Sequence, residues 1–215
     1  MQNIGAYGVE IKDIFHELIA YSIEEKKVVR FSKNDCEFGY RESIFKNKFK
    51  NQFVIVNVTF RLNKKPIFNT SYGAIENELE KMGVQIKSIK AISDAVKNIR
   101  RSKLPDPAVI GNAGSFFKNP TILTTEFKLL KEKFEKIVGY AIGENETKLA
   151  AGWLIEQCGW KGFRKNDAGC HEKQALVLVN YGIANGNEIL GLSGEIIFSV
   201  EEKFGVRLSR EVNVV

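Results

Sequence analysis

Two glycine-rich turns are the segments of this sequence best suited to holding a ligand. They are Gly5-Ala6-Tyr7-Gly8 and Gly111-Asn112-Ala113-Gly114-Ser115. Because glycine has no side chain, backbone at such a turn can approach a phosphate or a flat ring closely and offer its N–H groups. Neither turn has the spacing of a P-loop or of a dinucleotide-binding fingerprint. Taken alone, each turn is therefore more typical of a structural turn than of a binding site.

Two charged residues add to these candidates. Arg41 lies in the aromatic and glycine-containing run 38–43 and could present its planar guanidinium to a carboxylate or a phosphate. A surface ion pair with Glu42 or a neighbour is the simpler interpretation of this arginine. Glu211, close to the C-terminus, could equally be a solvated charge on an edge strand. Residue types alone leave both alternatives open.

The elements that must position these residues follow from hydrophobic periodicity. In the first hundred residues we expect mainly strands, at 28–32 and 52–62, where Val54, Val56, Val58 and Phe60 share one face at period two. From Ser88, a plausible N-cap, apolar residues recur at helical spacing up to position 99. The run Leu104-Pro105-Asp106-Pro107 should end this helix, and we place a domain boundary there.

The second half of the chain predicts three helices and two strands. The helices are expected at 124–137, 147–158 and 187–204, the last ending at Gly205, and the strands at 175–180 and 206–215. The sequence therefore predicts an α+β fold.

Composition excludes several classes of protein. The chain has 215 residues, 44% of them hydrophobic and 27% charged, which is enough for one large domain or two small ones. No apolar run approaches the roughly 18 residues of a membrane span, and no secretory signal is readable, so we expect a cytoplasmic protein without membrane contact. Three cysteines without C-x-x-C spacing and two histidines favour reduced thiols and no metal site.

The formal net charge of +6 suits an anionic partner such as a phosphorylated ligand. Nucleic acid is a possible partner on charge alone. The positive charges are dispersed, however, and the sequence has neither a long basic tail nor an aromatic RNA-binding signature, so we expect no nucleic-acid function.

Several motifs together resemble one family, the UDP-N-acetylenolpyruvoylglucosamine reductases, which are flavoenzymes of bacterial peptidoglycan synthesis. The resemblance covers the chain nearly end to end and rests on six ordered blocks: QNIGAYGVE at 2–10, CEFGYRESIFK at 36–46, SKLPDPAVIGNAGSFFKNP at 102–120, AAGWLIEQCGWKG at 150–162, HEKQALVLVN at 171–180 and LSREVNVV at 208–215.

The resemblance implies a reaction and its residues. NADPH would reduce FAD, and hydride would then pass to C3 of the enolpyruvyl ether of a UDP-sugar, giving UDP-N-acetylmuramate. By motif, Ser115 matches the proton donor to C2, Arg41 the residue on the substrate carboxylate, and Glu211 the third catalytic position. These roles agree with the chemistry, because a guanidinium stabilises the enolate that hydride addition creates, and a hydroxyl beside a carboxylate can deliver a proton.

Further site residues also follow from the resemblance. The expected substrate contacts are Tyr72, Lys103, Asn119, Tyr140 and Gln174. Tyr140 is assigned to a mobile loop of the family, with a packed core aromatic as the alternative. The expected FAD contacts are Gln2, Asn3, Gly5, Ala6 and Tyr7.

The resemblance also predicts the domain organisation. Residues 1–104 would be the C-terminal half of an FAD-binding α+β domain, 105–205 an α+β substrate-binding domain, and 206–215 a return strand carrying the catalytic glutamate. The family's N-terminal lobe would be absent, so we expect a fragment whose binding of flavin is in doubt. We also expect the protein to be a monomer. The alternative is a non-catalytic UDP-sugar-binding chain without bound flavin.

Overall fold

The computed structural model describes residues 1–214 and divides the chain into two compact units, Met1–Ile99 and Arg100–Val215. The division falls within a helix, α3 (Ile89–Lys103), a few residues before the proline-containing run expected to mark it. Both units contain helices and antiparallel strands, which confirms the α+β prediction. No helix in this part of the chain is both long and apolar enough to cross a membrane.

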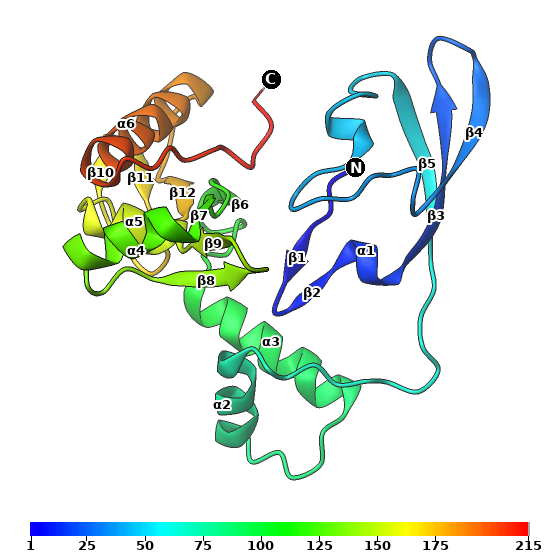
Figure 1. The fold of residues 1–215 in the computed structure, drawn as a ribbon. Coiled ribbons are helices and arrows are strands. Elements are labelled where there is room, and N and C mark those ends of the chain that lie inside the picture. Colours follow the sequence, from blue (N-terminus) through cyan, green and yellow to red (C-terminus); the bar gives the residue numbers. More distant parts are fainter. Residues whose placement is uncertain (215) are drawn as a thin grey trace. The chain divides into compact units, whose positions relative to one another are not determined.

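A three-stranded antiparallel sheet is the centre of the first unit (Figure 1). Its middle strand is β3 (Phe15–Ser22), flanked by β4 (Lys27–Ser32) and β5 (Phe53–Phe60). Leu18 and Ala20 of β3 are completely buried. A short hairpin, β1 (Gly5–Ala6) with β2 (Val9–Glu10), and the single turn α1 (Ile11–Ile14) precede the sheet, and a 3₁₀ turn, η1 (Ile44–Lys46), follows β4.

Strand β5 corrects the predicted orientation of its apolar face. Its partly buried residues are Phe53, Ile55 and Val58, whereas Val54 and Val56 are more than half exposed. A register shift opposite Ile19 and Ala20 changes which residues face the core. Local alternation could not show this shift, because it depends on pairing with β3, a strand that the periodicity did not reveal.

Two helices complete the first unit. α2 (Gly73–Lys81), which was not predicted, packs Ile75 and Leu79 against the Ala95 and Ile99 side chains of α3. The predicted N-cap of α3 is confirmed, because the hydroxyl of Ser88 accepts a hydrogen bond from the Ala91 N–H at 3.1 Å.

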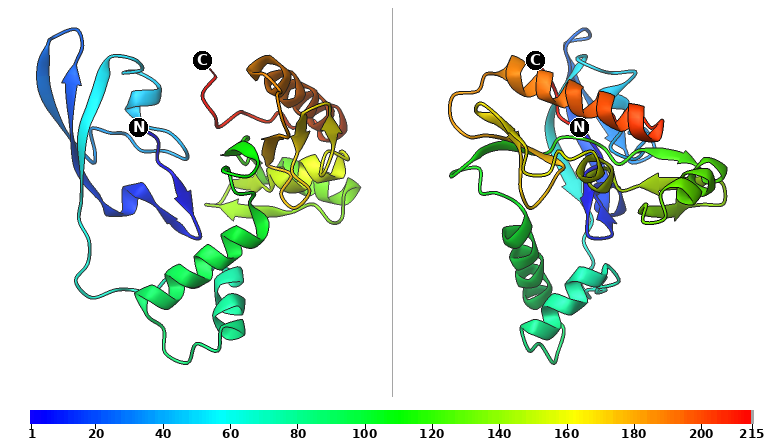
Figure 2. Two further views of the ribbon diagram at one scale, coloured as in Figure 1. Left: turned by 180° about the vertical axis from the view of Figure 1, so that it is seen from behind. Right: turned by 90° about the vertical axis from the view of Figure 1, so that its left-hand side faces the viewer.

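The second unit contains two sheets and three helices (Figures 1 and 2). The larger sheet has the order β10 (Arg164–Lys165), β11 (Ala168–Cys170), β12 (Val177–Asn180) and β6 (Gly111–Ser115), and the smaller one has the order β7 (Thr121–Leu123), β9 (Glu146–Leu149) and β8 (Gly139–Ile142). The helices are α4 (Thr124–Lys133), α5 (Ala151–Gln157) and α6 (Gly186–Phe204), and α6 packs on β11 and β12.

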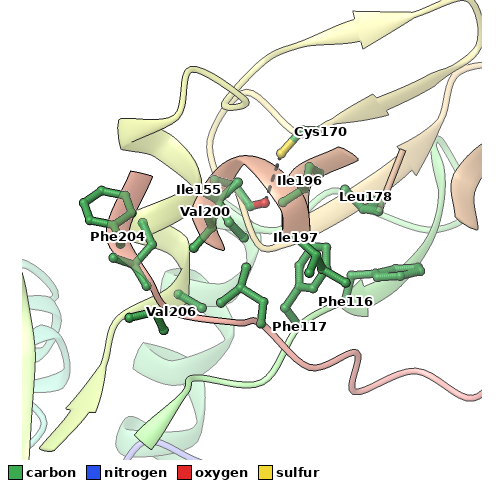
Figure 3. Close-up of a cluster of buried hydrophobic side chains, with 14 of the residues drawn as sticks. Phe116, Phe117, Ile155, Cys170, Leu178, Ile196, Ile197, Val200, Phe204 and Val206 are labelled. Carbon is green, nitrogen blue, oxygen red and sulfur yellow. Dashed lines mark hydrogen bonds between the residues drawn. The ribbon is translucent and has the colours of Figure 1, made fainter. Parts of the chain in front are cut away.

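The hydrophobic core of the second unit lies between these elements (Figure 3). Phe116 and Phe117, directly after β6, are buried in the same cluster as Ile196 and Val200 of α6. The Cys170 thiol lies in it too and donates a hydrogen bond to the carbonyl of Ala175 at 3.0 Å. The core therefore fixes the chain on the C-terminal side of Ser115.

Three predicted elements of this unit differ from the structure. The helix expected at 124–137 ends at Lys133, with Phe134 as its C-cap. The helix expected at 147–158 is only Ala151–Gln157, because Thr147 and Leu149 belong to β9 and are buried between strands β7 and β8 on either side. The strand expected at 206–215 is an extended segment that makes one isolated bridge, between Arg210 and Phe117. Val215 lies outside the described residues.

Candidate active site

Ser115 is the last residue of β6 and is exposed. The glycine before it has a φ of +73°, a left-handed conformation that glycine adopts without strain, and a bulge interrupts the pairing of β6 with β12 at this point. The amide oxygen of Asn112 accepts a hydrogen bond from the Gly114 N–H at 3.0 Å. Bulge, glycine and asparagine together define the backbone that presents the Ser115 hydroxyl.

Glu211 lies on the segment that pairs with the residues just after Ser115. Its N–H donates to the carbonyl of Phe116 at 2.8 Å, and the N–H of Lys118 donates to the carbonyl of Ser209, also at 2.8 Å. The structure thus brings the predicted proton donor and the predicted catalytic carboxylate onto neighbouring segments of one unit, although they are far apart in the sequence.

Two of the predicted substrate residues meet at the beginning of α5. The side-chain oxygen of Asn119 accepts a hydrogen bond from the Ala151 N–H at 3.0 Å. A Cβ atom on the neighbouring Gly152 would lie 3.2 Å from the side-chain oxygen of Gln174, so this glycine keeps the approach of Gln174 open. The N–H of Phe116 donates to the carbonyl of Leu176 at 2.7 Å, which links the Gln174 loop to the chain beside Ser115.

A cavity of about 630 Å³ adjoins this arrangement within the second unit. Asn112, Gly114 and Val177 of the sheet form one part of its lining, and Arg100 and Arg101 of the last turn of α3 form another. Lys103 is exposed on the same turn. Asp106 also lines the cavity, and the excess of positive charge suits a phosphorylated or carboxylated ligand. Positive charges are common in the last turn of a helix, and only the fold brings Arg100 and Arg101 close to the Gly114 turn.

Tyr140 occupies the middle of the edge strand β8, where it pairs with Lys148 of β9. Its side chain is 59% exposed, so the alternative of a packed core aromatic is wrong. The expected loop is a strand at this position, and Tyr140 contributes a solvent-accessible ring.

In the first unit, Arg41 is tied to the predicted cofactor segment. Its guanidinium donates a hydrogen bond to the carbonyl of Gly5 at 2.5 Å and lies 5.1 Å from the centre of the Tyr40 ring. Its backbone φ of +57° is in the left-handed region, which is uncommon for a residue with a side chain. Arg41 belongs to a different unit from Ser115 and Glu211.

The predicted cofactor residues divide into supporting and accessible groups. Asn3 is completely buried. Its side-chain nitrogen donates hydrogen bonds to Glu10 and to the carbonyl of Gly39, and its side-chain oxygen accepts one from the N–H of Lys12, so this side chain supports the turn. The side-chain oxygen of Gln2 accepts from Lys46. Ala6, in contrast, is exposed.

The hairpin turn between β1 and β2 is made of left-handed backbone beside two aromatic rings. Tyr7 and Gly8 have φ values of +54° and +79°, which turn the backbone sharply. The ring of Tyr7 meets that of Tyr72 edge to face, with centroids 5.3 Å apart, and Tyr72 is half exposed. The turn therefore combines accessible backbone with aromatic side chains, both of which can contact a flat group.

A protein-family comparison matches residues 106–215 to the C-terminal domain of UDP-N-acetylenolpyruvoylglucosamine reductase. These residues include Ser115, Asn119, Gln174 and Glu211 and amount to more than half of the chain. The chain belongs to the UDP-N-acetylenolpyruvoylglucosamine reductase family.

Relatives in this reductase family match the chain over its whole length. The reductase of Flavobacterium johnsoniae is 51% identical and that of Amoebophilus asiaticus is 50% identical, each over 100% of this chain. The chain spans 64% and 63% of these two relatives. The resemblance seen in the six sequence blocks is thereby confirmed.

A solved reductase has the same fold. The structure of the UDP-N-acetylenolpyruvylglucosamine reductase from Thermus caldophilus superposes with a TM-score of 0.59 and 19% sequence identity, covering 99% of this chain and 57% of that one. Both units therefore have counterparts in the fold of a family member.

Proposed function

We propose that this chain is part of an enzyme that uses NADPH and FAD to reduce the enolpyruvyl group of a UDP-sugar to UDP-N-acetylmuramate in peptidoglycan synthesis, in the cytoplasm. The observation that supports the proposal most is the pairing of the Glu211 and Ser115 segments, with Asn119 and Gln174 beside them. Nothing in the stability of the unit requires a hydroxyl and a carboxylate on these two neighbouring segments.

The chemistry that FAD supplies when bound is hydride transfer from NADPH to C3 of the enolpyruvyl ether. The hairpin turn Gly5–Gly8 would hold part of this cofactor, with Ala6 and Tyr7 in contact and Asn3 supporting the turn from below.

The residues of the second unit act on the substrate. After hydride addition, negative charge develops at C2 and on the adjoining carboxylate. The Ser115 hydroxyl donates the proton that C2 accepts, and Glu211 orients the proton relay that restores the hydroxyl. Lys103 pairs as a point charge with the diphosphate of the UDP-sugar, and Asn119, Gln174, Tyr72 and Tyr140 position the sugar nucleotide.

Arg41 stabilises the developing charge. Its guanidinium offers two parallel N–H groups to the substrate carboxylate, on which the enolate charge is shared. The hydrogen bond to the Gly5 carbonyl fixes the side chain before substrate arrives, so little reorganisation is needed during the reaction.

The role of Ser115 is tested by Ser115→Ala in the full-length flavin-binding enzyme of which this chain would be part, here called the gene product. We expect unchanged reduction of the flavin by NADPH but reoxidation by the enolpyruvyl sugar that is slower by on the order of 100-fold or more, because a general acid is lost. Stopped-flow absorbance separates the two half-reactions. Ser209→Ala is the matched control, since Ser209 is an exposed serine on the neighbouring segment, and it should retain the normal rate.

Reoxidation at the normal rate in Ser115→Ala would remove Ser115 from the mechanism. Calorimetric titration of the UDP-sugar into the 215-residue chain tests the competing function. A sugar-nucleotide-binding protein would be favoured over a reductase by two results together. The 215-residue chain would release heat on binding the UDP-sugar, and the gene product would show neither flavin reduction nor substrate turnover.

A further inference from the structure

The side chain of Arg210 is joined to helix α6 by a buried polar relay. Its Nε donates a hydrogen bond to the hydroxyl of Ser193 at 2.7 Å, and that hydroxyl donates to the carbonyl of Leu190 at 2.6 Å. Ser193 is completely buried in the middle of α6. Because an unsatisfied buried hydroxyl or guanidinium N–H is costly, each of the two groups holds the other in place.

The backbone of the same arginine pairs with the chain that follows Ser115. Arg210 forms an antiparallel bridge with Phe117. The two hydrogen bonds beside this bridge join Ser209 to Lys118 and Glu211 to Phe116. The side chain of Arg210 thus contacts α6, and its backbone pairs with the segment that follows Ser115.

This connection is important because the segment after Gly205 has little regular structure. Among the described residues this segment contains no β-strand, and residues 209, 213 and 214 are exposed to solvent. Val206 and Leu208 are buried in the core, but both precede Arg210. Beyond Leu208, Val212 packs against the same core, and the Arg210 side chain makes a polar contact that ties the segment to a long helix.

We propose that the Arg210–Ser193 contact is a positioning device that holds Glu211 in register with the Ser115 segment. Arg210 is a positioning residue and acts only through the backbone that it fixes. The part of the inference that concerns catalysis rests on the proposed reductase function, whereas the anchoring of the segment does not.

A matched pair of substitutions separates the hydrogen bond from the charge. In Arg210→Gln, the amide nitrogen is the same number of bonds from the backbone as Nε of arginine, so the donor to Ser193 remains while the charge is lost. Arg210→Met has a chain of similar length without a donor. Arg207→Met is the control for loss of a neighbouring positive charge, since Arg207 is exposed and pairs with Glu201 at 2.9 Å.

Amide hydrogen exchange in the 215-residue chain measures the anchoring directly. The amides to follow are those of Glu211 and Lys118, which form the hydrogen bonds on either side of the bridge. We expect both to exchange about 10- to 100-fold faster in Arg210→Met, the range that corresponds to losing a hydrogen bond from a charged donor. Ser193→Ala should have the same effect, and it serves alone if Arg210→Met does not fold.

In Arg210→Gln and in Arg207→Met, the amides of Glu211 and Lys118 should exchange at nearly the normal rate. Exchange in Arg210→Met and Ser193→Ala equal to that in Arg207→Met would overturn the anchoring, whatever the activity of the protein.

The second measurement is turnover of the flavin-bearing gene product. We expect kcat in Arg210→Met to fall about 10-fold with KM for the enolpyruvyl sugar unchanged, as when a group acting in the transition state is displaced, and Arg210→Gln to restore it. Faster exchange without a change in kcat would overturn the link between the anchor and catalysis. A gene product that lacks reductase activity without any substitution would reject the proposed function and leave the exchange result standing.

Discussion

Two residues with predicted ligand contacts have left-handed backbone, as do Lys26 and Asn166 in turns elsewhere. Tyr7 and Arg41 have positive φ angles although both carry side chains, and such a conformation costs about 1–3 kcal/mol, which the surrounding contacts must offset. The Arg41 guanidinium is held by the Gly5 carbonyl, and the Tyr7 ring by its contact with Tyr72. These tertiary contacts hold Tyr7 and Arg41 in a geometry that local backbone preference disfavours.

The buried thiol of Cys170 makes the stability of the protein depend on pH. Burial raises the pKa of Cys170 from 9.0 to about 12. The unfolded chain therefore loses this proton at lower pH than the folded chain, so the stabilisation is complete below pH 9 and is lost as pH rises toward 12. We expect the thiol to contribute a fall in unfolding free energy of about 1.4 kcal/mol per pH unit above pH 9.

Denaturant titration under reducing conditions at pH 8 and pH 10 measures this fall. Cys170→Ala removes the thiol and should show a shallower dependence than the unsubstituted chain. Equal slopes for the two proteins would mean that the folded thiol ionises as readily as the unfolded one.

At the scale of elements, pairing partners decide the structure of segments with ambiguous patterns. Residues 147–149 fit the helical spacing that continues to Cys158, yet they form the middle strand of the β7–β9–β8 sheet. As a middle strand, β9 satisfies backbone groups on both sides, and Leu149 is completely buried. By contrast, α6 has both a clear apolar stripe and clear end signals, and its prediction was correct within one residue.

The N-terminus of α6 has a capping box that can be tested by substitution. The Asn185 side chain accepts from the Glu188 N–H at 3.1 Å, and the Glu188 carboxylate accepts from the Asn185 N–H at 2.8 Å. Asn185→Ala should lower the free energy of unfolding by about 1 kcal/mol, because helix N–H groups lose their acceptor. Asn187→Ala, at an exposed position in the first turn, should change stability by less than about 0.5 kcal/mol.

Chemical denaturation of the three proteins checks this expectation. A loss in Asn187→Ala as large as that in Asn185→Ala would assign the effect to the helix turn as a whole and not to the cap.

For the whole molecule, each of the two units has a hydrophobic core of its own. The core of Arg100–Val215 joins α5 and α6 to residues of both sheets, and the first unit has separate clusters in its sheet and in its helix pair. The predicted catalytic residues are distributed between the units, with Ser115 and Glu211 in one and Arg41 in the other. The folding of each unit can thus be measured separately, whereas the proposed reaction needs residues of both units.

The 215-residue chain, purified alone, should contain little flavin. The cofactor residues expected from the resemblance are all in the short segment 2–7, which leads into the β1–β2 hairpin and includes the exposed Ala6. A contact area this small cannot offset the entropy lost when a large cofactor is immobilised. Visible absorbance of the purified protein measures bound flavin, and a stoichiometric yellow protein would contradict the expectation.

By itself, the sequence determined the α+β class, the N-cap of α3, the ends of α6 and the family. Ser88, Gly205 and the stripe of α6 are local signals, and local signals report hydrogen-bond caps and periodic faces within one element. The six motif blocks identified the family and selected Ser115, Arg41 and Glu211 because their types and order match its pattern.

Only the tertiary structure decided how these signals combine. Strand β3, the register of β5 and the strand at 146–149 depend on hydrogen bonds between segments that are distant in sequence, and no window of residues contains that information. The same is true of the site: Glu211 is placed by the bridge from Arg210 to Phe117 and by the anchor on Ser193. Such contacts form because backbone groups and buried polar groups must find partners, and those partners exist only once the chain has folded.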